Sequence, residues 1–266
     1  MGRMRLRYLT FSYLIGVFLL MSDLNGITSG LSVTDAFERK SYTSAEGKTL
    51  PYRICFPKKM IPGKRYPLVI FFHGAGERGA DNERQMKHGV PAIFAYTMTA
   101  NDAAIILVPQ CPEEKQWVDV PWGADSHLMP AKPSETMALA IALIQATILD
   151  QPVDAARVYV TGVSMGGFGT WDILQRMPAL FAGAVAVCGG GDTQLANRLK
   201  DIPIWAFHGD ADTVVKTQRS RDMIVALKVA GGEPRYTEYE GVGHDSWTQT
   251  YRNGAVLEWL FSQRKP

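Results

Sequence analysis

A strand-like run of β-branched and aromatic residues ends at glycines that flank a single serine. The run spans residues 157–169 and reads Arg-Val-Tyr-Val-Thr-Gly-Val-Ser-Met-Gly-Gly-Phe-Gly. Ser164 stands at the centre of a G-x-S-x-G pattern, with Gly162 and Gly166 on either side. Such a serine needs a strand that stops abruptly and a helix that starts at once, and the small neighbours let backbone segments approach closely. The pattern predicts a strand, a sharp turn and a helix, with the Ser164 hydroxyl exposed as a nucleophile.

Strand-like and helix-like segments alternate along the rest of the chain. Ser134 precedes Glu135 and a long apolar stretch, so it is expected to cap a helix that runs to residue 149. Further helices are expected at residues 165–176, 216–229 and 246–263, and strands at 33–40, 50–56, 67–72, 104–109, 157–163, 183–187, 202–207 and 235–239. Strands that alternate with helices predict an α/β fold with a mostly parallel central sheet and helices on both faces.

The first thirty residues differ from the rest. Three arginines precede an apolar stretch at residues 8–21, and Ser/Gly-rich sequence follows. This order is typical of a secretory signal peptide, and the apolar stretch is shorter than the roughly 20 residues that a membrane span needs. We therefore expect residues 1–30 to be a signal peptide or, if uncleaved, an N-terminal anchor. Residues 31–266 are expected to form one catalytic domain, secreted or periplasmic.

The charge balance and the cysteines exclude several classes of protein. The chain has 28 basic and 26 acidic residues, of which residues 1–30 hold three and one, so the remainder is formally neutral. A neutral domain without Lys/Arg runs predicts no nucleic-acid partner, and a membrane partner only if the N-terminal segment stays attached. Cys55, Cys111 and Cys188 form no C-x-x-C pair, so no metal site is expected. Export would permit a Cys55–Cys111 disulfide; three buried thiols are the alternative.

A serine nucleophile needs a histidine base. When the chain order is serine, acid, histidine, only His208 and His244 are candidates, because only they follow Ser164. His208 comes directly after a predicted strand and leaves no room for an acid before it, so a packing or turn role is favoured. His244 stands in the glycine-flanked loop Glu-Gly-Val-Gly-His-Asp-Ser-Trp, before the last predicted helix. We predict that His244 is the base.

The acid is expected in the loop after the strand that ends at Phe207. Asp210 and Asp212 both lie there, and Asp210 is well placed to bond its own turn backbone. Asp212 is therefore the preferred acid. Asp192, in Cys-Gly-Gly-Gly-Asp, is the outside alternative.

Two backbone amides should form an oxyanion hole. One is expected from Met165, the residue after the nucleophile, and the other from the glycine-rich loop at residues 73–79. Ala75 is the first choice in that loop, with Gly76 close behind. His73 is expected to brace the loop rather than to act as a base.

The loop also contains G-x-G-x-x-G, from Gly74 to Gly79, which is the pattern of a dinucleotide site. A dinucleotide site would need an acid at the end of the next strand to hold the ribose. Asp102 lies before that strand, at the wrong edge of the sheet, and no phosphate-binding G-x-x-x-x-G-K-S/T motif occurs. No cofactor is expected.

Together these motifs resemble the α/β-hydrolase superfamily, and within it serine esterases of the phospholipase/carboxylesterase type. Their neighbours include predicted peptidases, polyhydroxybutyrate depolymerases and dienelactone hydrolases. The matching stretches are His-Gly-Ala-Gly-Glu-Arg-Gly at 73–79, Val-Pro-Gln-Cys-Pro at 108–112, Val-Ser-Met-Gly-Gly-Phe-Gly-Thr-Trp-Asp at 163–172, His-Gly-Asp-Ala-Asp at 208–212 and Gly-His-Asp-Ser-Trp at 243–247. The resemblance implies a catalytic triad of Ser164, Asp212 and His244, in agreement with the assignment from the residues.

Residues 111–133 form a long proline-rich segment without helical or strand periodicity. Long connections of this kind are commonly binding loops, so Trp117 and Trp122 are expected to line a substrate pocket, the alternative being that they pack the segment onto the domain. We expect a small-molecule or polysaccharide-linked ester with a short acyl chain as substrate. A serine peptidase of the same fold is the second hypothesis, and an inactive hydrolase-fold binding protein is the third. The sequence does not determine the oligomeric state.

Overall fold

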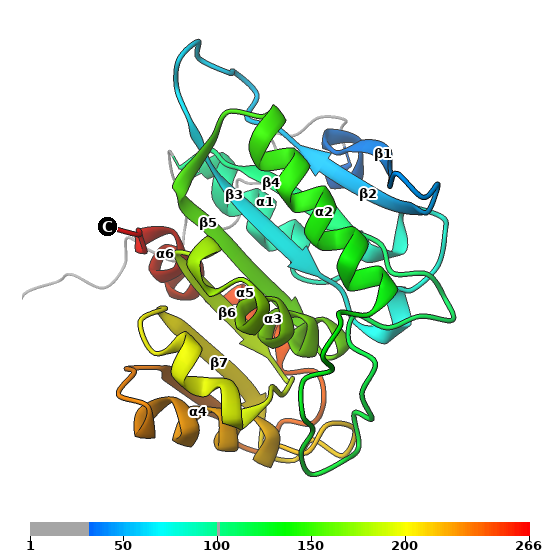
Figure 1. Cartoon of the computed structure of the whole chain (residues 1–266). Helices are drawn as coiled ribbons and strands as arrows, with labels where there is room; N and C mark the ends of the chain where they lie inside the picture. The colour runs from blue at the N-terminus through cyan, green and yellow to red at the C-terminus, as the bar shows by residue number, and fades with distance from the viewer. Residues whose placement is uncertain (1–31, 100–101) are drawn as a thin grey trace, which may run out of the picture. The chain divides into compact units, whose positions relative to one another are not determined.

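Eight strands form one sheet in the computed structural model, which describes residues 32–99 and 102–266 (Figure 1). The strand order is β1-β2-β4-β3-β5-β6-β7-β8. The first two pairings, β1 with β2 and β2 with β4, are antiparallel, and all others are parallel. The bounds are β1 Glu38–Thr43, β2 Thr49–Cys55, β3 Tyr66–Phe72, β4 Ile105–Pro109, β5 Val153–Val163, β6 Gly183–Val187, β7 Ile204–Gly209 and β8 Arg235–Tyr239.

Helices cover both faces of this sheet, because its central strands are apolar on both sides. All seven residues of β3 are buried. Along β3, Ile70 and Phe72 face the layer of α2 and α3, whereas Phe71 meets Tyr251 of α5 at a ring distance of 5.9 Å. Figure 1 shows α2, α3 and α4 in front of the sheet and α1 behind it. The bounds are α1 Val90–Thr99, α2 Glu135–Asp150, α3 Met165–Arg176, α4 Gln218–Val229, α5 Trp247–Arg252 and α6 Gly254–Ser262. The predicted α/β-hydrolase architecture is confirmed.

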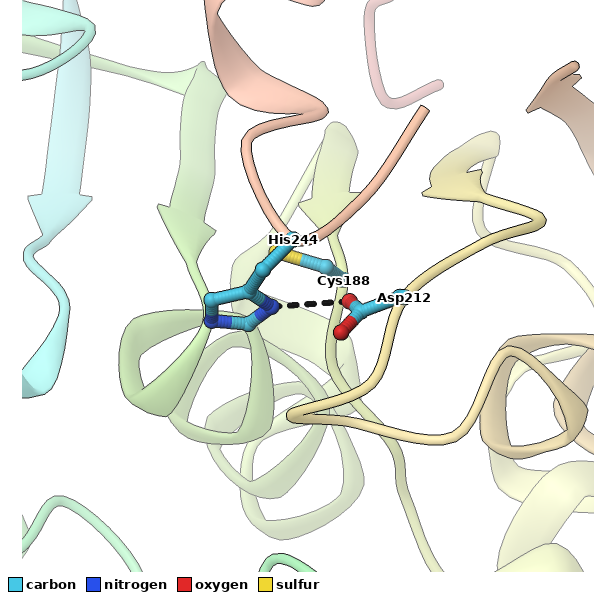
Figure 2. A group of neighbouring side chains, drawn as sticks. All are labelled: Cys188, Asp212 and His244. Atoms are coloured by element: carbon cyan, nitrogen blue, oxygen red, sulfur yellow. Dashed lines mark hydrogen bonds and ion pairs between the residues drawn. The ribbon is translucent and has the colours of Figure 1, made fainter. Parts of the chain in front are cut away.

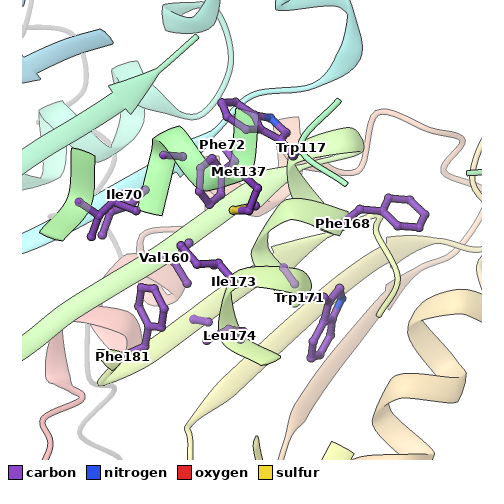
Figure 3. Close-up of a cluster of buried hydrophobic side chains, with 14 of the residues drawn as sticks. Ile70, Phe72, Trp117, Met137, Val160, Phe168, Trp171, Ile173, Leu174 and Phe181 are labelled. Carbon is purple, nitrogen blue, oxygen red and sulfur yellow. The ribbon is translucent and has the colours of Figure 1, made fainter. Parts of the chain in front are cut away.

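The hydrophobic core lies between the sheet and the layer of α2, α3 and α4, and Figure 3 shows part of it. Phe72, Met137 and Phe168 come from β3, α2 and α3, and Trp117 adds a ring from the long 111–133 segment. The Phe72 and Trp117 rings lie 4.7 Å apart. Each fully buried side chain of this size contributes roughly 1.5–3 kcal/mol to stability. The first part of the segment, up to Val120, therefore contributes to the core of the protein.

The ends of the helices follow local hydrogen-bonding signals. The Ser134 hydroxyl accepts from the Met137 amide, which confirms it as the cap of α2. The helix expected at 246–263 is instead two helices, because the Asn253 side chain accepts from the Ala255 amide and starts α6 anew. The strand expected at 33–40 is also corrected: residues Val33–Ala36 form a 3-10 turn, and β1 begins at Glu38.

Helix α1 was not predicted, although one signal for it was present. Pro91 is the second residue of α1, and proline is common in the first turn of a helix because its missing N–H is not needed there. The polar residues Lys87 and His88 stand just before α1, so no apolar periodicity marks where the helix begins.

The three cysteines are free and buried, so the buried-thiol alternative holds and the Cys55–Cys111 disulfide that export would permit is not formed. The signal peptide or anchor predicted at residues 1–30 lies outside the described residues and stays a prediction. Within residues 32–99 and 102–266, no helix has both the length and the apolar character that crossing a membrane requires.

Candidate active site

Ser164 occupies a sharp turn between β5 and α3. Its backbone has φ 55° and ψ −118°, which is a strained conformation for a residue with a side chain. The Ser164 amide donates to the Val187 carbonyl at 3.0 Å, which ties the turn to the neighbouring strand β6. At Gly166 a Cβ atom would lie 1.9 Å from the Phe72 carbonyl oxygen, so only glycine fits there. The close packing of β3 against the start of α3 holds the serine in this turn.

Three side chains form one hydrogen-bonded row. The Ser164 Oγ lies 2.8 Å from His244 Nε2, and His244 Nδ1 lies 2.7 Å from Asp212 Oδ2. Figure 2 shows the His244 ring facing the Asp212 carboxylate. The three residues follow β5, β7 and β8, whose carboxyl ends lie at the same edge of the parallel sheet. The structure therefore brings together the three residues predicted for the triad, in the order and contacts that proton transfer from serine requires.

Both oxygens of Asp212 are occupied. Oδ1 accepts from the amides of Val214 and Val215 at 2.8 and 3.0 Å, and Oδ2 faces both His244 and His208. Burial raises the pKa of Asp212, but hydrogen bonds from the two histidines and the two amides outweigh it and hold that pKa well below its usual value. The acid is thus ionised at neutral pH and available to stabilise a positive charge on His244.

His208 supports the acid, in agreement with its predicted structural role. Its Nε2 lies 3.2 Å from Asp212 Oδ2 and 3.0 Å from the Val215 carbonyl, so this nitrogen carries a hydrogen. Its Nδ1 is 2.7 Å from the Ser220 hydroxyl. His208 is fully buried and fixes the Asp212 loop against the start of α4.

The structure corrects the role expected of Asp210. Its Oδ1 accepts from the Gly241 amide at 2.7 Å, not from its own turn; the turn amides are bound by Asp212 itself. Gly241 lies in the loop that carries His244, so Asp210 links the acid loop to the base loop. Asp192, the outside alternative, is used elsewhere: it accepts from the amides of Gln194 and Met129, each at 2.9 Å.

The loop at residues 73–79 lies against the serine, since a Cβ on Gly74 would be 3.7 Å from the Ser164 Cβ. His73 braces this loop as expected: Nδ1 donates to the Gly74 carbonyl at 2.7 Å, and Nε2 accepts from the Cys111 amide at 2.9 Å. Burial lowers the pKa of His73 to about 4, which keeps it neutral and in this tautomer. A trans peptide points its N–H away from its C=O, so holding the Gly74 carbonyl also sets the direction of the Ala75 amide.

Arg78 acts in the same way on the next peptide. Its Nε donates to the Ala75 carbonyl at 2.9 Å, and this contact orients the Gly76 amide. The amides of Ala75, Gly76 and Met165 bind no acceptor among the described residues. All three predicted oxyanion donors are therefore unoccupied, and the assignment among them stays a prediction.

The two tryptophans differ from the expected pocket lining. Trp117 is fully buried and donates from Nε1 to the His73 carbonyl at 3.0 Å, so the expectation that it faces substrate is corrected. It packs the 111–133 segment onto the oxyanion loop instead. Trp122 is half-buried, with the Arg78 guanidinium 6.0 Å from its ring. Its role in binding substrate stays a prediction.

Two residues beside the row were missed from the sequence. The Trp247 ring lies edge-on to His244 at 5.3 Å, and Cys188 places its sulfur within 4.8 Å of the ligand atoms of Asp212 and His244. Cys188 has φ 41° and directly precedes three glycines, a sign of a tight turn at a strand end that could have been noticed. Trp247 stands only three residues after His244.

Cys188, Asp212 and His244 have side chains of types that can bind metal ions (Figure 2). Burial raises the pKa of the Cys188 thiol to about 12, so the sulfur is protonated at neutral pH, whereas metal ligation needs the thiolate. His244 Nδ1 donates a hydrogen bond to Asp212 Oδ2, and the two atoms lie 2.7 Å apart. The chemistry of this group fits a hydrogen-bonded row better than a metal centre.

The fold, the strained serine turn and the serine–histidine–aspartate row define an α/β-hydrolase. Residues 62–254 match the family model described as phospholipase/carboxylesterase. The chain belongs to this family. It is therefore a carboxylic ester hydrolase.

Individual relatives agree with this assignment. The chain is 24% identical over 195 residues to "Acyl-protein thioesterase 1 homolog 1" of Dictyostelium discoideum, covering 67% of this chain and 83% of the relative. It is 24% identical over 197 residues to "Carboxylesterase SOBER1" of Arabidopsis thaliana, covering 66% and 82%. A solved thermostable esterase superimposes with a TM-score of 0.81 at 38% identity and covers 88% of this chain. This chain spans only 64% of that esterase's length.

Proposed function

We propose that the protein hydrolyses carboxylic esters with short acyl chains through a covalent acyl-enzyme on Ser164. The observation that carries the proposal is the row from the Ser164 Oγ through His244 to Asp212, with contacts of 2.8 and 2.7 Å. A serine hydroxyl is a weak nucleophile by itself, and a hydrogen-bonded base that is oriented by an acid activates it. The family membership supports the same chemistry.

The reaction follows from these contacts. The Ser164 Oγ attacks the ester carbonyl carbon while His244 Nε2 takes the hydroxyl proton. The Met165 amide and an amide of the 73–79 loop stabilise the negative oxygen of the tetrahedral intermediate. The bond to the alcohol oxygen then breaks, and His244 returns the proton to that oxygen. Water, deprotonated by His244, attacks the acyl-enzyme and releases the acid with the serine restored.

The preference for short acyl chains rests on the 111–133 segment. Hydrogen bonds hold it at both ends and in the middle: the Ser134 hydroxyl donates to the Trp117 carbonyl at 2.7 Å, Arg219 donates to Ala124 at 3.0 Å, and Asp192 accepts from the Met129 amide at 2.9 Å. A segment bound to the core in this way does not swing aside as a lid. The proposal of short acyl chains rests on the absence of a segment free to open over a longer chain among these contacts.

A labelling experiment with a rate series tests the proposal. A fluorophosphonate probe should label wild-type protein and not Ser164→Ala. Rates on p-nitrophenyl esters of increasing chain length should peak at acetate to butyrate. Absence of labelling and of turnover would favour the inactive binding protein, and a preference for a peptide panel over the esters would favour the peptidase.

We also propose that residues 1–30 direct export and that the mature enzyme works outside the cytoplasm. The support is the arginine-flanked apolar stretch at residues 8–21. N-terminal sequencing of the protein recovered from the periplasm or medium tests this. Recovery of the uncleaved chain in the membrane fraction would instead make the segment an anchor.

A further inference from the structure

The alcohol part of an ester must leave past the His244 ring. His244 Nε2, which lies 2.8 Å from the Ser164 Oγ, has to reach the leaving oxygen to protonate it. The atoms bonded to that oxygen therefore extend toward the neighbours of His244. These neighbours decide which alcohols bind.

Trp247 and His88 form the surface next to His244. The Trp247 ring meets His244 at 5.3 Å and His88 at 5.4 Å between ring centroids. Trp247 opens α5 directly after the His244 loop, and His88 lies between the oxyanion loop and α1. Trp247 thus follows the loop that carries His244, and His88 follows the oxyanion loop, and both loops form the site.

A cavity of about 290 Å³ lies against these two rings. Its lining includes Lys87 and His88 on one side and Trp247, Thr248, Tyr251 and Arg252 of α5 on the other. Tyr251 is buried, with its hydroxyl 2.6 Å from Thr161, so it forms a fixed floor. The volume suffices for an aromatic ring or a small sugar-sized group.

Lys87 and Arg252 make the lining of this cavity cationic. None of its lining residues is acidic. Lys87 and Arg252 are exposed, and neither has a carboxylate oxygen within 4.0 Å among the described residues. Two acids lie nearby: Glu77, 3.4 Å from His88 on its buried side, and the exposed Asp245, which bonds the Thr248 backbone and hydroxyl.

The cavity beside α4 differs in this respect. It measures about 320 Å³, and its lining combines Arg219 with the carboxylates of Asp125 and Asp222. The two acids outnumber the single cation there. Two further cavities are lined by cations without acids, one at Lys64 and Arg65 and one at Lys58, Lys59 and Lys64, but neither is lined by Trp247 or His88. The Trp247 cavity therefore combines a cationic lining with a ring that contacts His244.

We propose that the Trp247 cavity binds an anionic group on the alcohol part of the ester, with Lys87 and Arg252 as its cations and the Trp247 ring as an apolar wall. This inference rests on the proposed ester hydrolysis. The substrate class is then an ester whose alcohol carries a carboxylate, sulfate or phosphate. The acyl group stays uncharged and lies on the side of the serine away from His244.

A matched pair of esters tests the inference. 3-Acetoxybenzoate and 3-acetoxybenzamide share the acetyl group and the ring, and only the first has a charge on its alcohol part. We expect wild-type kcat/KM to favour the benzoate by roughly tenfold, after division by the ratio of their hydroxide-catalysed rates, on the scale of two exposed ion pairs. The double variant Lys87→Gln/Arg252→Gln should reduce this preference to near unity.

Lys58→Gln is the matched control, because Lys58 is exposed on the loop after β2, at the opposite edge of the sheet. It should keep the wild-type preference. In wild-type protein, 0.5 M NaCl should weaken the preference, since salt screens exposed charges, and this measurement needs no variant. Hydrolysis of both esters without charge preference, or a preference that survives in the double variant, would overturn the inference. Failure to cleave either ester would instead refute the proposed function.

Discussion

At the scale of single residues, the site depends on side chains that each have one orientation. Asp212 uses Oδ1 for two turn amides and Oδ2 for two histidines, so its carboxylate has no freedom to rotate. His73 and Arg78 hold carbonyl oxygens and thereby set the direction of amides next to the serine. Rigid donors and acceptors of this kind need no reorganisation during the reaction, which is the main source of electrostatic catalysis.

Ser164→Ala removes the nucleophile, because alanine has no atom to form the acyl-enzyme. We expect kcat on p-nitrophenyl acetate to fall by roughly 10⁴-fold or more. The protein should still fold, as the backbone strain at position 164 does not depend on the hydroxyl. Steady-state rates with circular dichroism as the folding control check this; near-normal activity in a folded variant would place the nucleophile elsewhere.

Asp212→Asn and Asp210→Ala should affect different properties. The neutral amide introduced by Asp212→Asn cannot stabilise a positive His244, so kcat should fall by roughly 10³ to 10⁴. Asp210→Ala removes one hydrogen bond between two loops and should lower the free energy of unfolding by about 1 kcal/mol, with a smaller effect on kcat. Measuring kcat and Tm for both variants decides the matter. The larger loss of kcat in Asp210→Ala would transfer the role of the acid to Asp210.

At the scale of elements, the 111–133 segment and helix α2 are joined through Ser134. Its hydroxyl accepts from the Met137 amide and donates to the carbonyls of Trp117 and Gln116, so one side chain caps the helix and anchors the segment. The buried Trp117 then contacts the oxyanion loop through the His73 carbonyl. A change at the helix cap can therefore reach the active site through two contacts.

Ser134→Ala should lower the free energy of unfolding by about 1–2 kcal/mol, because it removes a helix cap and a buried hydrogen bond together. Urea denaturation monitored by tryptophan fluorescence measures this. Ser41→Ala is the control, because Ser41 is exposed on β1, and this substitution should change stability by less than about 0.5 kcal/mol. Equal effects of the two substitutions would contradict the anchoring role of Ser134.

At the scale of the whole molecule, burial of neutral histidine makes stability depend on pH. The pKa of His73 is lowered to about 4 by burial in the folded protein, whereas in the unfolded chain it has its ordinary value. Between these two values the unfolded state binds a proton that the folded state does not, so the free energy of unfolding rises with pH. The stability is fully present above the ordinary value and is lost as the pH falls toward 4. His127, whose pKa is also lowered to about 4, acts in the same direction.

We expect His73 to account for about 3 kcal/mol of the stability lost between pH 7 and pH 4. The variant His73→Asn keeps polar atoms but does not titrate, so its unfolding free energy should vary less with pH over this interval. Urea titrations of both proteins at pH 7, 6, 5 and 4 make the comparison. Parallel pH dependences would show that His73 titrates alike in the folded and unfolded states.

Sequence patterns sufficed for the α/β class, most strands, the serine turn and the histidine that lies beside Ser164, because each depends on local periodicity or on glycines at fixed spacing. The chain order of Ser164, Asp212 and His244 also follows from sequence, since successive parallel strands end at one edge of the sheet. Only the tertiary structure decided that Asp212 contacts His244 and Asp210 contacts Gly241, since both acids stand in one short loop and these partners are distant in the chain. The burial of Trp117 and the charged surroundings of Trp247 were decided in the same way: contacts between distant segments depend on how the layers pack, and packing has no local sequence signal.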